Sequence, residues 1–253
     1  MADEAPNVSR RQSRRRRRSG RWGFRGKTVW DWLPIVGVFL IPVVIVLGTW
    51  AITWQQGKLE QRRVLEERYL AGARARDEVL QTYLSEMGSL LLEEDLRDSE
   101  RGSEVRTLAR ARTLMVLEML DPERKSEAMQ FLDEANLVHT TPSKPKVPVI
   151  SLEGANLIGT DLENANFTGA KLEGADLRGT DLRRADLTDG WLIYADLSGA
   201  DLENADLSGV HLFVVDFREA NLRGAIGITN EELEQQAESL EGATMPNGQK
   251  YED

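Results

Sequence analysis

Residues 150–225 carry a large apolar side chain at every fifth position, fifteen times in succession. The members of this series are Leu152, Leu157, Leu162, Phe167, Leu172, Leu177, Leu182, Leu187, Leu192, Leu197, Leu202, Leu207, Leu212, Phe217 and Leu222. A period of five fits neither the turn of an amphipathic helix nor the two-residue alternation of a strand. Each five-residue phrase is therefore predicted to form one structural unit that stacks on its neighbours, as in a solenoid.

The positions on either side of each apolar centre describe the shape of this unit. Two residues before the centre the side chain is usually Ala or Thr, and two residues after it Gly, Asn or Asp predominates. In an extended segment residues i and i−2 point the same way, so one small and one large apolar side chain should point inward while the intervening Asp or Asn points outward. Gly, Asn and Asp tolerate positive φ, so each unit should be a very short strand that ends in a corner.

Phrases such as Ala175-Asp176-Leu177 and Ala205-Asp206-Leu207 resemble the tandem motif of the pentapeptide-repeat family. The resemblance covers about a third of the chain. It implies an all-β, right-handed quadrilateral β-helix with four pentapeptides in each coil. Residues 150–225 would then form nearly four coils, and at about 4.8 Å between stacked strands a rod of roughly 18 Å.

A second apolar pattern lies near the N-terminus. Residues from Leu33 to Thr53 include no charged side chain, and a helix of this length spans the hydrocarbon core of a bilayer. Tryptophans that suit the two membrane interfaces flank the segment: Trp30 and Trp32 on one side, Trp50 and Trp54 on the other. A buried core helix would not account for these tryptophans, so residues 28–54 are predicted to form a transmembrane helix.

The distribution of charge predicts how this helix is oriented. Residues 1–27 carry ten basic and two acidic side chains, including the run Arg14–Arg18, and show no apolar periodicity. They are predicted to be a disordered tail that flanks the span, although such a run could also bind nucleic acid or anionic lipid. Fewer basic residues follow the span, so we expect a single-pass protein of the bacterial cell membrane with a cytoplasmic N-terminus and an extracytoplasmic C-terminal domain.

Residues 55–138 are predicted to be helical. A long helix should cover 55–98, a second one Glu104–Leu120, and a third should start at Pro122 behind the cap Asp121 and end near Val138. We expect a small bundle in which Leu90 to Leu92, Met115 and Phe131 pack together. A seven-residue seam leaves a coiled-coil stalk open: Leu59, Tyr69, Ala73, Leu80, Tyr83, Met87 and Leu90, interrupted by Arg62, Glu66 and Arg76.

Two further segments complete the predicted organisation. Residues 139–149 contain three prolines and are predicted to be a semi-rigid linker before the repeats. After Ala225 the five-residue period fails, and a short acidic helix is expected over Asn230–Ser239. Leu240, Ala243 and Met245 then resume the repeat spacing, so residues 226–253 are predicted to cap the open end of the rod.

No pattern in the chain predicts catalysis. There is no cysteine, and the two histidines, His139 and His211, have no metal-binding partner at a fixed spacing. The sequence contains no G-x-S-x-G, phosphate-binding loop, dinucleotide fingerprint or HExxH motif. The regular Asp residues are a property of the repeat, and solvated carboxylates have no raised pKa that would suit a general acid. We therefore expect no enzyme activity, no cofactor and no metal site.

One side of the predicted rod departs from the repeat. Residues twenty apart stack on one face if a coil holds four units, and one face changes from polar to apolar side chains along the rod. The residues of this candidate interaction patch are Trp191, Ile193, Tyr194, His211, Phe213 and Val214. Such a patch marks a partner surface unless the chain itself covers it, with residues 230–239 or the helical bundle as covers. The family resemblance adds a homodimer through the C-terminal coils as a candidate.

Two functional hypotheses follow from the sequence. The first is a membrane-anchored, non-enzymatic scaffold whose rod binds an unidentified protein. The second comes from family members whose acidic rods resemble the phosphate pattern of DNA and bind a topoisomerase. Six basic residues interrupt fourteen acidic ones in 151–228, and an extracytoplasmic rod would not meet a topoisomerase. We therefore favour the scaffold, with the membrane and a protein as partners and no direct contact with nucleic acid.

Overall fold

The structure is a computed structural model that describes residues 29–140 and 147–252. The chain divides into two units, Met1–Leu65 and Glu66–Asp253, and each is described by itself. The expectation for residues 1–27, and most of the one for the Pro-rich linker, lie outside the described residues. The predicted domain boundaries remain predictions, apart from the element ends given below.

α1 (Val29–Leu92) is a helix of 64 residues and crosses the boundary between the two units. It contains one stretch that is long and apolar enough to cross a membrane. Every side chain from Val38 to Trp54 is exposed, so this stretch is not a core helix of the described protein. Trp50 and Trp54 stack with ring centroids 6.3 Å apart, and Lys58 Nζ lies 3.7 Å from the Trp54 ring centroid. The side chains of Trp30 and Trp32 lie outside the described part of α1.

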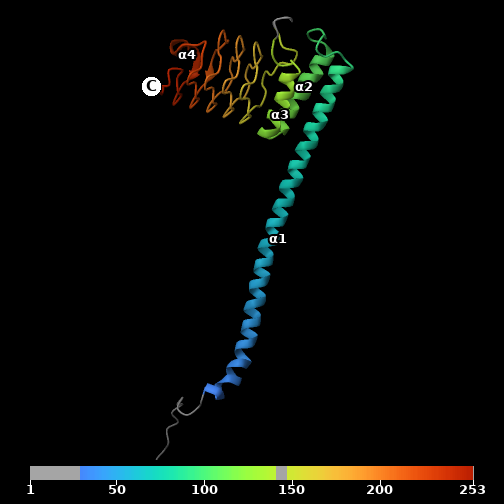
Figure 1. The fold of residues 1–253 in the computed structure, drawn as a ribbon, viewed down its shortest axis with the longest axis vertical. Helices are drawn as coiled ribbons and strands as arrows, with labels where there is room; N and C mark the ends of the chain where they lie inside the picture. Colours follow the sequence, from blue (N-terminus) through green and yellow to red (C-terminus); the bar gives the residue numbers. More distant parts are fainter. Residues whose placement is uncertain (1–28, 141–146, 253) are drawn as a thin grey trace, which may run out of the picture. The chain divides into compact units, whose positions relative to one another are not determined.

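The repeats of residues 150–226 wind into stacked coils, drawn from yellow to red in Figure 1. Parallel bridges join residues twenty apart, such as Asp176 with Asp196 and Asp181 with Asp201. Backbone hydrogen bonds between coils recur at spacings of nineteen and twenty-one residues, for example from Leu177 N to Asp196 O at 2.8 Å and from Asp176 N to Ala155 O at 2.9 Å. Four five-residue units therefore complete one coil, as the family resemblance implied.

Each unit turns a corner two residues after its apolar centre. All fifteen residues at this position have positive φ, as a turn with a left-handed third residue requires. Gly and Asn were expected there, but Arg184, Tyr194, Val214 and Glu219 adopt the same conformation. A hydrogen bond closes fourteen of these corners, as from Ala175 N to Leu172 O at 3.0 Å, and the corner at Val214 is the exception. The coil geometry is thus imposed even where the local residue does not favour it.

The outward Asp or Asn has a structural role that the sequence reasoning missed. Its Oδ1 accepts a hydrogen bond from the backbone N–H two residues further on; for example, Thr188 N donates to Asp186 Oδ1 at 2.9 Å. The same bond forms at Asn156, Asp161, Asn166, Asp176, Asp181, Asp196, Asp201, Asp206, Asp216 and Asn221. These side chains were expected to be only solvated. They instead satisfy a backbone donor beside each corner.

All fifteen apolar centres are buried, as predicted, and the small residues beside them fill the rest of the rod. The core is continuous with that of a helical bundle formed by the C-terminal part of α1, α2 (Glu104–Met119) and α3 (Pro122–Glu134). Leu132, Leu137 and Ile150 are fully buried where the bundle meets the first coil. The bundle therefore covers the N-terminal end of the rod, beside which α2 and α3 lie in Figure 1.

Three details of the predicted bundle are wrong. α1 ends at Leu92 rather than near residue 98, and α3 ends at Glu134 rather than near Val138. Leu92 and Met115, expected in the core, are 85% and 64% exposed. The seam residues Leu80, Tyr83, Met87 and Leu90 instead pack inward against α2 and α3. These four seam residues therefore pack within the core of one chain, and they are not exposed for a coiled coil with a second chain.

Polar contacts hold the bundle to the first two coils. The buried Lys125 of α3 donates from Nζ to Asn156 Oδ1 at 2.7 Å, and Asp161 N donates to Ser126 Oγ at 2.9 Å. His139 is buried too, with Nδ1 2.9 Å from Asp133 Oδ1. Thr140 N donates to Thr168 O at 2.8 Å. The first residues of the expected linker are therefore packed against the rod.

The other end of the rod is closed by residues 227–252. α4 (Asn230–Gln236) begins at Thr229 with a capping box, but it ends before the predicted Ser239. The strand that follows it, β2 (Ala237–Ser239), pairs in parallel with β1 (Val215–Asp216) of the rod. Leu240, Ala243 and Met245 are buried, and Leu222 N donates to Thr244 O at 2.8 Å. A partial coil thus resumes after the helical insertion, as the spacing predicted.

Two threonines inside the rod provide a matched test of this packing. Thr180 Oγ1 donates to Leu157 O at 2.9 Å, whereas the equally buried Thr160 Oγ1 has no hydrogen-bond partner. An unpaired buried hydroxyl costs about 1–3 kcal/mol, while a paired one contributes about 0.5–1.5 kcal/mol. Thr160→Ala should therefore raise or preserve the free energy of unfolding, and Thr180→Ala should lower it by about 1 kcal/mol. Thermal unfolding of both variants checks this, and equal destabilisation would contradict it.

Candidate interaction surface

The candidate patch lies on one face of the third and fourth coils, as the twenty-residue stacking predicted. Lys171, Trp191 and His211 are bridged in one column along this face. Trp191 is 39% exposed, Tyr194 62% and Phe213 55%, and His211 is exposed as well. Ile193 and Val214 are half-buried. We call these six residues, from Trp191 to Val214, the aromatic face.

The rings of the aromatic face pack against one another across the two coils. Trp191 and His211 have ring centroids 4.4 Å apart, with their planes tilted by 40°. Tyr194 and Phe213 meet edge to face, with centroids 5.9 Å apart. Lys171 Nζ lies 5.9 Å from the centroid of the Trp191 ring, within reach of a cation–π interaction. The rings therefore hold each other in place and present a preorganised apolar surface.

This surface costs the rod some of its regular hydrogen bonds. Trp191 and His211 occupy the outward position that elsewhere carries Asp or Asn, and so does Lys171 before them. None of these side chains is a carboxylate or amide oxygen that could accept from the backbone N–H two residues on. Lys171, Trp191 and His211 thus lack a bond that the other three faces make in nearly every coil.

The aromatic face also carries backbone strain. Tyr194 has φ 60° and Val214 has φ 55°, at corners where most units have Gly or Asn. The left-handed region costs an L-residue about 1–2 kcal/mol, and a β-branched side chain is especially unfavourable there. Strain of this kind is typical of positions where a side chain serves something other than stability.

No described segment covers the aromatic face. The C-terminal end of α4 lies beside it, because Val214 N donates to Gln236 O at 2.9 Å, and Leu233 of this helix is buried. The exposures of Tyr194 and Phe213 nevertheless remain above one half. Within residues 29–140 and 147–252, the two covers considered from the sequence, residues 230–239 and the bundle, leave these rings open to solvent.

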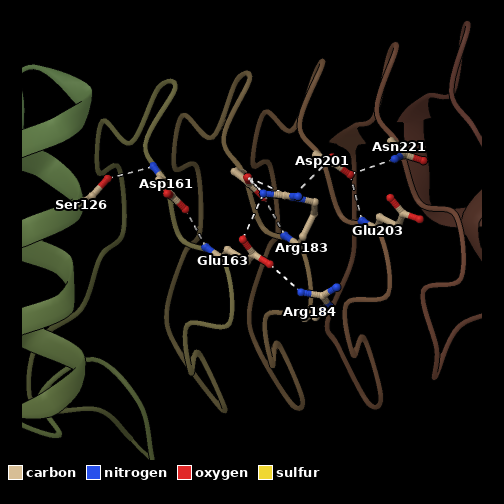
Figure 2. Close-up of polar contacts among 9 residues, drawn as sticks. Ser126, Asp161, Glu163, Arg183, Arg184, Asp201, Glu203 and Asn221 are labelled. Carbon is tan, nitrogen blue, oxygen red and sulfur yellow. Dashed lines mark hydrogen bonds and ion pairs between the residues drawn. The ribbon is translucent and has the colours of Figure 1, made fainter.

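The opposite face of the rod, whose apolar centres are Leu162, Leu182, Leu202 and Leu222, shows the ordinary polar surface (Figure 2). Arg183 Nη2 lies 2.6 Å from Asp181 Oδ2 and 3.1 Å from Glu163 Oε2, and its Nε lies 3.9 Å from Asp201 Oδ2. Arg184 Nη1 is 2.7 Å from the other oxygen of Glu163. Glu163, Asp181 and Asp201 are therefore paired with arginines of the same rod, while Asp161 and Glu203 on this face have no such ion pair, so the carboxylates do not form an unbroken negative stripe.

The same arginines set the ionisation of their partners. Hydrogen bonds from Arg183 lower the pKa of Asp181, and hydrogen bonds from Arg178 lower the pKa of Asp176. Both carboxyls are therefore ionised at neutral pH and cannot act as general acids there. The stabilisation they provide should be fully present above the ordinary pKa of Asp and be lost as the pH falls from that value through the lowered pKa of the folded state. Among the described residues, no group of three or more His, Asp or Glu is arranged to hold a metal ion.

The comparison with protein families agrees with the coil geometry. The model described as pentapeptide repeats matches eight copies, over residues 150–189 and 192–226. The chain belongs to the pentapeptide-repeat family. Its repeats therefore form the right-handed β-helix of that family. The match is interrupted at Gly190 and Trp191, where the aromatic face begins.

Several solved pentapeptide-repeat structures are similar to the rod. A protein of the Arabidopsis thaliana thylakoid lumen is 30% identical, over 41% of this chain and 68% of that one, with a TM-score of 0.31. HetL of the cyanobacterium Nostoc, involved in heterocyst differentiation regulation, is 32% identical over 40% and 56%, with a TM-score of 0.25. QnrB1, a plasmid-mediated fluoroquinolone resistance protein, is 14% identical over 37% and 56%, with a TM-score of 0.25. This chain thus spans about two thirds of the first of these proteins and about half of the other two. The comparison with curated proteins found no match.

The strain at Val214 can be measured against a matched valine. Val214→Gly removes a β-branched side chain from positive φ, so the rod should become more stable by about 1 kcal/mol. Val210 lies in the same unit at an inward, partly buried position without positive φ, so Val210→Gly should destabilise the rod. Thermal unfolding of the two variants checks the contrast. A lower melting temperature for Val214→Gly would show that the residue is not strained.

Proposed function

We propose that this pentapeptide-repeat protein is a non-enzymatic, membrane-anchored scaffold that binds a protein partner through the aromatic face. The rod supplies a rigid platform, because its coils share one core with the bundle that caps them. Trp191, Tyr194 and Phe213 supply large apolar contact area with few rotatable bonds, which is typical of the energetic centres of protein interfaces.

The observation that carries this proposal is the cost of the aromatic face. Regular repeat residues would restore the hydrogen bonds missing at Trp191 and His211, and Gly or Asn would relieve the strain at Tyr194 and Val214. A sequence optimised for the rod alone would therefore not have this face. Sites that lower stability in favour of another role are typically binding sites.

The membrane anchor in this proposal is the apolar stretch of α1. The side chains from Val38 to Trp54 are exposed, and the predicted span from Leu33 to Thr53 matches the thickness of a bilayer. The Trp50–Trp54 stack and the nearby Lys58 suit the boundary between hydrocarbon and headgroups. The excess of basic residues before the span favours a cytoplasmic N-terminus and an extracytoplasmic rod.

Mimicry of DNA, with a topoisomerase as partner, fits less well. Arg178, Arg183 and Arg184 neutralise carboxylates along the rod, so the negative charges do not repeat like phosphates. The proposed topology would also keep the rod away from DNA enzymes. The scaffold is therefore the function we propose, with the aromatic face as its binding site.

Topology can be tested by fusing alkaline phosphatase or a fluorescent protein after Asp253 in a bacterial host. We expect phosphatase activity without fluorescence, because the excess of basic residues should keep the N-terminus in the cytoplasm. The membrane fraction should retain the fusion after high-salt washing and release it in detergent. Fluorescence without phosphatase activity would place the rod in the cytoplasm, and a gyrase supercoiling assay would then test the mimicry.

Partner binding can be tested with a photo-crosslinking phenylalanine analogue at Phe213 of the full chain in its native cells. We expect an adduct of higher mass after irradiation, because Phe213 lies at the centre of the proposed interface. The exposed Arg223 on the polar face is the control position and should give no such adduct. Tyr194→Ser in the same chain should reduce the adduct at least tenfold. Equal labelling at both positions, or none at Phe213, would contradict the proposal.

A further inference from the structure

The aromatic face is bounded by groups of different charge at its two ends. In the coil before it, Lys171 Nζ lies 4.0 Å from Glu173 Oε1, so these two charges balance each other. In the coil after it, α4 stands where the next five-residue unit of this face would be. The pairing of Val215 with Ala237 and the bond from Val214 N to Gln236 O determine this register.

α4 adds uncompensated negative charge to the end of the aromatic face. Its sequence NEELEQQ contains three glutamates and no basic residue. Glu232 is engaged in the capping box, where its Oε2 accepts from Thr229 N at 2.9 Å. Glu231 and Glu234 are exposed and take part in none of the ion pairs found among the described residues. Glu234 and Glu231 precede Gln236 by two and five residues, so these exposed carboxylates lie within about 8 Å, measured along α4, of the residue that is bonded to Val214.

We infer that the partner of the aromatic face is a basic protein segment. Its apolar side chains would lie on Trp191, Tyr194 and Phe213, and its Lys or Arg side chains would meet Glu231 and Glu234. This inference rests on the proposed function, because it specifies the partner of the same surface. Charge complementarity of this kind sets orientation and rejects partners of the wrong sign.

Two other occupants match this surface less well. In a pair of identical chains, α4 would face either α4 of the second copy, which repels it, or the Lys171–Glu173 pair, which is already balanced. An anionic membrane surface would be repelled by Glu231 and Glu234. A basic protein segment satisfies both the apolar and the acidic parts of the surface.

The test uses the full chain with the photo-crosslinker at Phe213 and reverses the charge of α4. Glu231→Lys with Glu234→Lys should reduce the adduct roughly tenfold, because the new lysines would repel the basic side chains of the partner. The double change to Gln, which preserves size and avoids a cation in the first turn of the helix, should reduce it several-fold. Glu123→Lys with Glu127→Lys on α3 is the matched control and should leave the yield unchanged. Mass spectrometry should find the cross-link in a peptide rich in Lys or Arg, and the yield should fall with added salt.

The outcomes separate the inference from the function on which it rests. An adduct that Tyr194→Ser removes, but that neither α4 variant changes, would overturn the basic partner and keep the binding function. An adduct between two copies of the chain, or with a peptide lacking basic residues, would also overturn the inference. No adduct at Phe213 in any variant would overturn the proposed function itself. If Glu231→Lys and Glu234→Lys disturb α4, the Gln pair alone decides between these results.

Discussion

The architecture of this protein depends on the hydrogen bonds between stacked coils, which pair three of the five backbone amides of a regular unit with carbonyls nineteen or twenty-one residues away. A single five-residue unit can close its own corner but cannot satisfy its remaining donors or bury its centre alone. It gains both only when another coil stacks on it, as when Leu177 bonds to Asp196. The first and last coils therefore need caps of other kinds. The bundle serves at one end, and α4 with β2 and the last partial coil serves at the other.

This constraint explains which parts of the sequence are free to vary. Inward positions and corners are fixed by the coil, whereas the outward position only has to offer an acceptor to the backbone. The acceptor is worth about 1 kcal/mol, so a rod with many such bonds can lose two of them. The aromatic face uses this tolerance. Trp191 and His211 stack where other faces have Asp, and the remaining coils keep the rod intact.

Much of the fold could be predicted because its period is exact and its signals are redundant. The fifteen apolar centres and the resumed coil at Leu240 to Met245 followed from spacing. The four-unit coil, and with it the clustering of the six patch residues, followed from the family resemblance. The exposure of Met115 could not be predicted. An apolar residue on a short helix can face either way, and the rotation of α2 depends on its contacts with α1 and the rod. α4 ends early because the pairing of Ala237–Ser239 with β1 replaces its last turn. The hydrogen bond that each outward Asp or Asn accepts from the backbone could have been predicted, because the strict recurrence of these residues indicated a local structural role.

The stacking of each coil on the one before it also sets an order of assembly. Contacts between coils join residues that are only about twenty apart in the sequence. Once one coil has formed, the next coil therefore closes a short loop at small entropic cost. The bundle precedes the rod in the sequence and offers the first coil a finished surface. During synthesis the chain can therefore add one rung at a time to a folded base, as repeat proteins do by propagation from a nucleus. The helices that cover the start of the rod therefore provide the folded surface on which its first coil forms.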